Sequence, residues 1–217
     1  MPYKQDYPGY LFDLDGTLVD TAPDINAALN HVLVHSGYAS VSESLTRHWV
    51  GHGARACLTQ ALEHNEVPEH LIDEMLASFL ERYHAHVADL STPYPGVVET
   101  LQTLLDRGAK LGVVTNKHSN LTTKLLDELG LARFFACTIC GDSTAHPKPA
   151  ADPTLLACQK LDLPPADVLF VGDSTTDVAS ARAAGCAIVC VPEGYNHDVP
   201  ATQLGADAII DSLQDLV

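Results

Sequence analysis

The feature that most constrains the fold is an alternation of short apolar runs with helical segments along the second half of the chain. Runs such as KLGVV, VLFVG and AIVCV suit strands that are buried on both faces of a sheet. The helical segments between them end at glycines, and a glycine is the usual stop of a helix. Strands and helices that alternate in this way pack as a parallel sheet with helices on both faces. The sequence therefore predicts an α/β fold.

A long helical block interrupts this alternation after its first strand. Between Pro23 and Ala88, apolar residues recur at spacings of three and four, with almost no strand signal. The segment Ser91–Gly96 contains two prolines and is the expected return to the sheet. We therefore predict two domains. These are an α/β catalytic core, residues 1–19 and 91–217, and an inserted helical cap, residues 20–90.

The charge balance excludes two classes of partner. The chain has 12 Lys and Arg residues against 28 Asp and Glu residues, a net charge of −16. Such a surface repels nucleic acid and anionic membranes. The longest apolar stretches fall far short of the roughly 20 residues that span a bilayer, and the start of the chain does not resemble a secretory signal. We expect a cytoplasmic protein, and the sequence leaves a monomer or a dimer open.

The first motif with chemical meaning is DLDGTLVD, at the end of the first predicted strand. Asp13 and Asp15 are two residues apart, and Gly16 allows a sharp turn after them. Two carboxylates this close repel each other unless a cation or a proton intervenes, and Mg²⁺ is the natural cation for oxygen ligands. A carboxylate can also attack phosphorus and form a phosphoaspartate. We therefore treat both as candidate catalytic and metal-binding residues.

Three further candidate residues lie in two later segments. Thr115 and Asn116 follow an apolar run, where the Thr115 hydroxyl and backbone N–H can hold a phosphoryl oxygen. Lys148 lies between two prolines, in a stiff extended segment that does not suit an ordinary helix-surface lysine. There it can neutralise a nucleophile and a transferring phosphoryl group.

The last motif is VGDSTTD, after another apolar run. Asp173 and Asp177 are four residues apart, so Asp177 lies one helical turn beyond Asp173 on the same side. Both add carboxylate oxygens to the expected metal site. Open α/β sheets bind their ligands at the carboxyl ends of the strands, and that is where we expect these motifs.

Together these segments resemble the haloacid dehalogenase superfamily of phosphohydrolases. The resemblance rests on DLDGT, Thr115, Lys148 and GDSTTD, and it covers essentially the whole chain. It implies a Rossmann-like doubly wound parallel sheet with an inserted helical cap. Within the superfamily, DLDGTLVDTAPDI, WVGHGA, SARAAGC and PEGYNHD are most similar to phosphoglycolate phosphatases. The implied activity is Mg²⁺-dependent hydrolysis of a small phosphorylated metabolite, with 2-phosphoglycolate as the first candidate substrate.

The resemblance also implies a role for each motif residue. Asp13 would be the nucleophile, and Asp15 would protonate the leaving alkoxide and then activate water. Thr115 and Asn116 would bind the phosphoryl group, and Lys148 would stabilise it. The implied Mg²⁺ ligands are Asp13, the backbone carbonyl of Asp15, Asp173 and Asp177.

Several relatives remain as alternatives to a phosphoglycolate phosphatase. Dehalogenases of the superfamily lack the second aspartate, so Asp15 argues against that activity. Phosphonatases use a cap lysine, and no lysine lies between Lys4 and Lys110. A sugar-phosphate phosphatase, for example one acting on N-acetylmuramic acid 6-phosphate, and a related phosphomutase stay open. So does an inactive binding protein with the same fold.

Substrate specificity is expected to come from the cap. His52 is flanked by Gly51 and Gly53, and we expect this loop to point into the cleft. A carboxylated substrate needs a cation beside its carboxylate. The candidates for this end of the substrate are His52, Gly53, Arg55 and Arg47.

Overall fold

The computed structural model describes residues 5–217. Its centre is a six-stranded sheet in the order β5-β4-β1-β6-β7-β8, with every neighbouring pair parallel. Numbered along the chain within the sheet, this is the 3-2-1-4-5-6 order of doubly wound Rossmann folds. The order reverses between β1 and β6, so the carboxyl ends of these two strands border the crevice where ligands bind in such sheets. The predicted fold class is therefore confirmed.

The elements follow one another as the sequence alternation predicts. The strands of the large sheet are β1 (Gly9–Phe12), β4 (Lys110–Val114), β5 (Cys137–Ile139), β6 (Val168–Gly172), β7 (Ala187–Cys190) and β8 (Ala208–Ile209). The helices beside them are α5 (Val97–Asp106), α6 (Ser119–Glu128), α7 (Asp152–Leu161) and α8 (Thr175–Ala184). The final short helix is a 3₁₀ turn, Leu213–Leu216. No helix within residues 5–217 is long and apolar enough to cross a membrane.

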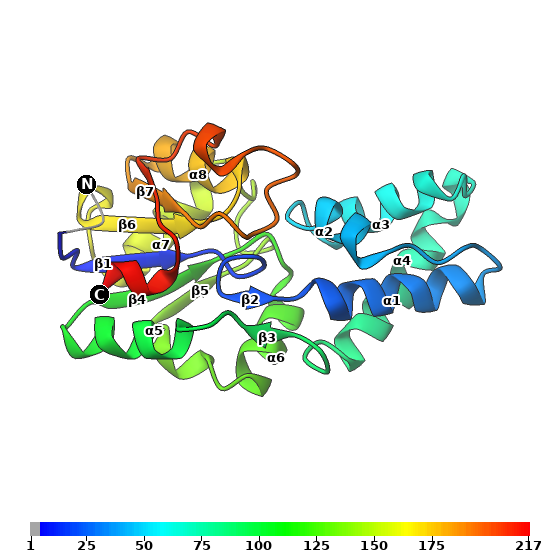
Figure 1. The fold of residues 1–217 in the computed structure, drawn as a ribbon, viewed down its shortest axis with the longest axis horizontal. Coiled ribbons are helices and arrows are strands. Elements are labelled where there is room, and N and C mark those ends of the chain that lie inside the picture. The colour runs from blue at the N-terminus through cyan, green and yellow to red at the C-terminus, as the bar shows by residue number, and fades with distance from the viewer. Residues whose placement is uncertain (1–4) are drawn as a thin grey trace.

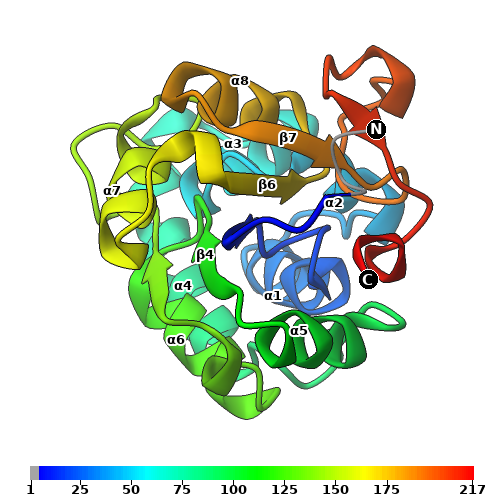
Figure 2. The same cartoon turned by 90° about the vertical axis from the view of Figure 1, so that its left-hand side faces the viewer.

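Alternating strand residues divide between two hydrophobic clusters, one on each face of the sheet. In β1, Phe12 packs into the cluster that includes α5 and α6, whereas Leu11 packs into the cluster that includes α7 and α8. In β6, Val171 and Phe170 divide in the same way. Figure 2 shows α5 and α6 on one side of the strands and α7 and α8 on the other. Because alternate side chains of each strand pack into opposite clusters, both faces of the strand are anchored. The strand ends, and the side chains that follow them, therefore have fixed positions.

Four helices lie beyond the carboxyl ends of the strands, to the right of the sheet in Figure 1. They are α1 (Ala22–His35), α2 (Glu43–Trp49), α3 (Ala54–His64) and α4 (Ile72–Ala85). The chain enters and leaves this group through β2 (Val19–Asp20) and β3 (Thr92–Pro93), which pair antiparallel. The buried carboxylate of Asp24, near the start of the helical group, accepts hydrogen bonds from the N–H groups of Leu90 and Ser91, near its end. These bonds connect the two segments through which the chain enters and leaves the group.

Candidate active site

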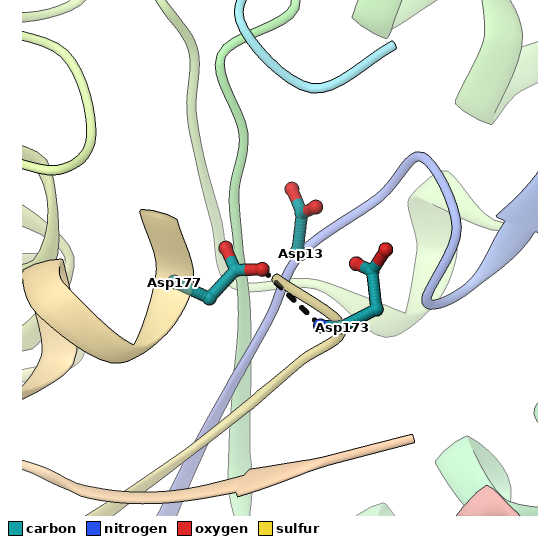
Figure 3. A group of neighbouring side chains, drawn as sticks. All are labelled: Asp13, Asp173 and Asp177. Atoms are coloured by element: carbon teal, nitrogen blue, oxygen red, sulfur yellow. Dashed lines mark hydrogen bonds between the residues drawn. The ribbon is translucent and has the colours of Figure 1, made fainter. Parts of the chain in front are cut away.

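Three carboxylates meet at the crevice between β1 and β6. Asp13 follows β1, Asp173 follows β6, and Asp177 lies in the first turn of α8 (Figure 3). One oxygen from each lies within 4.8 Å of the others, and all three residues are buried. The parallel sheet places the ends of β1 and β6 side by side, so residues 160 positions apart in sequence share one small volume.

Lys148 supplies positive charge to this cluster. Its Nζ donates to Asp13 Oδ1 at 2.7 Å, to Asp177 Oδ1 at 2.6 Å and to the carbonyl of Val114 at 2.8 Å. The residue is only 4% exposed, so these ion pairs are shielded from water. Burial acts to lower the pKa of Lys148, but the two carboxylates raise it, and the ammonium stays charged.

The cluster holds more negative charge than Lys148 can balance. Burial raises the pKa of Asp13 to about 7, against the lowering effect of Lys148. Burial, together with Asp177 and Asp13, also raises the pKa of Asp173 well above its ordinary value. When all three carboxylates are ionised beside one ammonium group, two negative charges stay uncompensated. A divalent cation with a preference for oxygen ligands fits this deficit.

The carboxylates differ in how many donors they already have. Asp177 Oδ2 accepts from the N–H groups of Asp173 and Ser174 and from the Ser174 hydroxyl, in a capping box at the start of α8. Its other oxygen accepts from Lys148. Asp177 thus links the helix start to Lys148. The carboxylates of Asp13 and Asp173 are the more accessible ligands for a metal ion.

Asp173 is held by two residues that the sequence analysis did not single out. The Thr17 hydroxyl donates to Asp173 Oδ1 at 2.7 Å, and the Tyr195 N–H donates to Oδ2. The backbone approaches closely as well, because a Cβ on Gly16 would lie 2.5 Å from Asp173 Oδ2. Gly16 has φ +90°, so the sharp turn expected after the two aspartates is present.

Asp15 lies apart from this cluster. Its Oδ1 accepts from Lys117 Nζ and from the Thr21 hydroxyl, both at 2.7 Å. Lys117 is buried, and its Nζ also lies 4.9 Å from the centre of the Tyr83 ring on α4. The two neighbouring aspartates therefore each have a lysine of their own. The Asp15 carboxylate does not join the three-carboxylate group, and its backbone carbonyl as a metal ligand stays a prediction.

Thr115 and Asn116 lie between the cluster and the helical segment. The Thr115 N–H donates to the carbonyl of Ile139 at 2.9 Å, which continues the pairing of β4 with β5. The expectation that this N–H holds a phosphoryl oxygen was therefore wrong, and only the hydroxyl remains for that purpose. The Asn116 amide donates to the carbonyls of Gly51 and Lys148. Its Oδ1 is buried and finds no hydrogen-bond partner in the described part of the chain.

The four cap candidates take different positions. Gly53 lines the cavity beside Asp13. His52 stacks on His197, with ring centroids 4.7 Å apart. Arg55 pairs with Asp73 in solvent, with 61% of its side chain exposed, and Arg47 pairs with Asp20 at 2.7 Å. The structure therefore brings Gly53, but neither arginine, to the cavity wall.

A cavity of about 40 Å³ connects these parts. On the sheet side its wall includes Asp13, Asp15, Thr115 and Lys117. On the helical side it includes Val50, Gly51, Gly53, Phe79 and Tyr83. One water needs roughly 10–15 Å³ in this measure, so the cavity has room for a few waters or a very small ligand.

Sequence reasoning missed Lys117, Thr17 and Tyr195. Lys117 was visible two residues after Thr115, but nothing in the sequence shows that its side chain turns inward to Asp15. Thr17 follows Gly16 directly, and its bond to Asp173 spans 156 residues. Tyr195 lies within PEGYNHD, which was noted only as a resemblance. All three residues belong to the site through contacts with residues that are distant in the sequence, and the sequence alone does not show such contacts.

Comparisons with known proteins identify the family of the chain. The family model described as haloacid dehalogenase-like hydrolase matches residues 10–191. The chain is 41% identical to the phosphoglycolate phosphatase of Agrobacterium fabrum, over 96% of this chain and 90% of that protein. It is 39% identical to phosphoglycolate phosphatase 1 of Pseudomonas aeruginosa, over 95% of this chain and 77% of that protein.

A solved structure extends the similarity to three dimensions. The crystal structure of a predicted phosphoglycolate phosphatase from Haemophilus somnus superposes with a TM-score of 0.91 at 33% identity. The match covers 98% of this chain and 97% of that one. The chain therefore belongs to the haloacid dehalogenase-like hydrolase family.

Proposed function

We propose that this protein is a Mg²⁺-dependent phosphomonoesterase that hydrolyses 2-phosphoglycolate through an aspartyl-phosphate intermediate. The observation that carries the proposal is the buried cluster of Asp13, Asp173 and Asp177 around Lys148 at the carboxyl ends of the strands. Phosphoryl transfer needs a positioned nucleophile and positive charge at the phosphoryl oxygens. The relatives named phosphoglycolate phosphatase, which match nearly the whole chain, support the choice of substrate.

The donor set supports Mg²⁺ as the cofactor. Asp13 and Asp173 would hold the ion, the Asp15 carbonyl would be a further ligand, and Asp177 would ligate it or orient Lys148. When bound, Mg²⁺ would neutralise phosphoryl oxygens and offset the two uncompensated charges of the cluster.

The protein side chains divide the reaction into two steps. Asp13 attacks phosphorus, the bond from phosphorus to the leaving oxygen breaks, and Asp15 donates a proton to that oxygen. Asp15 then takes a proton from water, which attacks phosphorus and breaks its bond to Asp13, releasing inorganic phosphate. The Thr115 hydroxyl, the Asn116 backbone N–H and Lys148 would hold the phosphoryl oxygens during both steps.

Lys117 connects this chemistry to a carboxylated substrate. It is a buried cation in the cavity wall, and its present partner is Asp15. We propose that the carboxylate of 2-phosphoglycolate pairs with the Lys117 ammonium in place of Asp15. Asp15 would then lose a positive neighbour and could hold the proton that the leaving oxygen needs. A substrate without a carboxylate would leave the Lys117–Asp15 ion pair intact.

The helical segment would act as the cap that closes this site. We propose the boundaries expected from the sequence, with residues 20–90 as the cap and the β2–β3 pair as its connection to the core. Closure excludes water and completes the cavity wall. The small cavity supports a two-carbon substrate over a hexose phosphate. We further propose that the protein acts in the cytoplasm.

A substrate panel tests the proposal directly. The kcat/KM values for 2-phosphoglycolate, ethyl phosphate and N-acetylmuramic acid 6-phosphate should be compared with Mg²⁺ and with a chelator. We expect 2-phosphoglycolate to be preferred by at least about 100-fold over ethyl phosphate, from one buried charge pair, and turnover to require Mg²⁺. A preference for the sugar phosphate would instead identify a sugar-phosphate phosphatase, and isomerisation of a sugar phosphate would identify a phosphomutase. Binding without turnover would identify an inactive binding protein.

The variant Lys117→Met tests the substrate-carboxylate contact. It should remove most of the preference for 2-phosphoglycolate over ethyl phosphate, because the neutral side chain cannot pair with a carboxylate. Lys124→Met is the matched control, since Lys124 pairs with Glu128 on the surface. An unchanged substrate preference in Lys117→Met would exclude the proposed contact.

A further inference from the structure

A segment from the core reaches over to the helical cap. It runs from Gly194 to Asp198, after β7, and its Tyr195 hydroxyl accepts from the N–H groups of Thr21 and Ala22 at the start of α1. His197 and Asp198 have φ angles of +53° and +63°, in the left-handed region that few non-glycine residues adopt. Such strained positions persist where surrounding contacts determine them.

The contacts of His197 explain this conformation. Its Nδ1 lies 2.7 Å from the carbonyl oxygen of His48, so Nδ1 carries the proton and donates it. Its ring stacks on His52 at an interplanar angle of 14°. Among residues 5–217, its buried Nε2 has no hydrogen-bond partner, and a Cβ on Gly51 would lie 3.2 Å from it. The ring therefore fills the space against the backbone of the loop that follows α2.

This loop is also part of the cavity wall. Val50, Gly51 and Gly53 line the cavity, and the Gly51 carbonyl accepts from the Asn116 amide at 3.1 Å. A shift of the loop would change both the size of the cavity and the position of Asn116. The contacts of His197 therefore act on the substrate-binding end of the site without touching it.

We propose that His197 is a positioning residue that, through His48 and His52, holds residues 50–53 against the cavity, and that it does so only while both rings are neutral. This inference rests on the proposed function, because it assigns the loop to the substrate side of that site. A second proton on His197 would sit on Nε2, which has no acceptor. Two cationic rings 4.7 Å apart would also repel each other.

The residues around the His52–His197 pair offer little negative charge that could stabilise a protonated ring. Two further titratable groups lie at this contact, His48 and Asp198, with His48 Nδ1 3.4 Å from Asp198 Oδ1. Within residues 5–217, no ion pair joins either His52 or His197 to a carboxylate. Burial, and then His197, lowers the pKa of His52. Acidic solution should therefore loosen the loop rather than tighten it.

Three variants separate this role from general stability. His197→Ala removes the donor and should raise KM for 2-phosphoglycolate about fivefold, the effect of one hydrogen bond, with kcat changed less than about twofold. His197→Asn should restore most of the KM, because an amide can donate to the His48 carbonyl and asparagine tolerates the left-handed backbone. In the wild type, KM should rise in acidic solution, where His52 becomes protonated although burial lowers its pKa. His52→Phe should reduce this rise, because it keeps a stacked ring but removes one titrating group.

The chain offers a matched control. His35 Nδ1 also contacts a backbone carbonyl, that of His31 at 2.6 Å, and the two rings are 4.1 Å apart on the exposed side of α1. His35→Ala should leave KM and its pH dependence unchanged. Equal KM values for His197→Ala and the wild type, or an acidic rise that His52→Phe leaves intact, would overturn the inference.

A second readout keeps the inference separate from the proposed function. Amide hydrogen exchange of residues 50–53 at pH 7.5, without substrate, should be faster in His197→Ala than in His197→Asn and the wild type. If the wild type did not hydrolyse 2-phosphoglycolate, the proposed function would fail while this comparison still tested the contact. Equal exchange in all three proteins would overturn the inference.

Discussion

The two ends of the site are built differently. At the sheet end, Asp13, Lys148 and Asp173 are at most 7% exposed and bond to one another or to their immediate surroundings. At the cap end, several contacts are partly exposed, such as the Arg47–Asp20 ion pair and the stacked histidines. Chemistry therefore depends on a rigid, shielded cluster, whereas substrate access depends on contacts that cost little to break. Changes at the sheet end should affect kcat and stability, and changes at the cap end should affect KM.

The largest expected effect is the loss of the nucleophile. Asp13→Asn should lower kcat by roughly 10⁴-fold or more, because an amide cannot form the phosphoaspartate. The melting temperature should not fall, because the amide removes one of three crowded negative charges and Lys148 keeps Asp177. Steady-state kinetics and calorimetry measure both, with the exposed Asp127→Asn as control. Substantial activity in Asp13→Asn would contradict the assignment.

Removal of Lys148 should damage stability most. Lys148→Met leaves the buried Asp13 and Asp177 without their cation, which costs about 3–5 kcal/mol in the free energy of unfolding. Lys124→Met at the surface should cost at most about 1 kcal/mol. Urea unfolding of both variants gives the comparison. Equal losses would show that burial does not distinguish the two lysines.

Mg²⁺ should stabilise the protein more in alkaline than in acidic solution. The pKa of Asp13 is raised to about 7 from 3.8 without metal, so its protonated form favours the folded state. That contribution is complete below about pH 4 and is lost as the pH rises through about 7. Mg²⁺ binds the ionised carboxylate, so the rise in melting temperature that it causes should be greater at pH 8 than at pH 6. An equal rise at both values would contradict this account of Asp13.

The smallest expected effect tests the cap end. Arg55→Ala should change kcat/KM for 2-phosphoglycolate less than about twofold, because the side chain pairs with Asp73 in solvent, where ion pairs contribute little. The measurement should include ethyl phosphate as the comparison substrate that lacks a carboxylate. A tenfold loss confined to the carboxylated substrate would instead restore Arg55 as the residue that binds the carboxylate.

The same contrast explains how much the sequence alone could predict. Apolar runs and strand-end motifs predicted the parallel sheet. Asp13 and Asp173 lie together because each directly follows a strand, and adjacent parallel strands end side by side. Asp177, in the first turn of α8, and Lys148, in a loop, join them as expected. The inward turn of Lys117 and the reach of His197 to the cap depend on side-chain directions in loops. The hydrophobic periodicity of a sequence does not show the directions of side chains in loops. The Thr115 N–H was misassigned because β4 continues its pairing one residue further than the strand itself.

The central claim is that Asp13 accepts the phosphoryl group, and trapping the intermediate tests it most directly. The wild-type enzyme should be mixed with 2-phosphoglycolate and Mg²⁺, quenched in acid within milliseconds, digested and analysed by mass spectrometry. We predict one added phosphoryl group on the peptide that contains Asp13, and none when Mg²⁺ is chelated. A phosphoryl group on any other residue, or rapid turnover with no phosphorylated peptide at any quench time, would contradict the account.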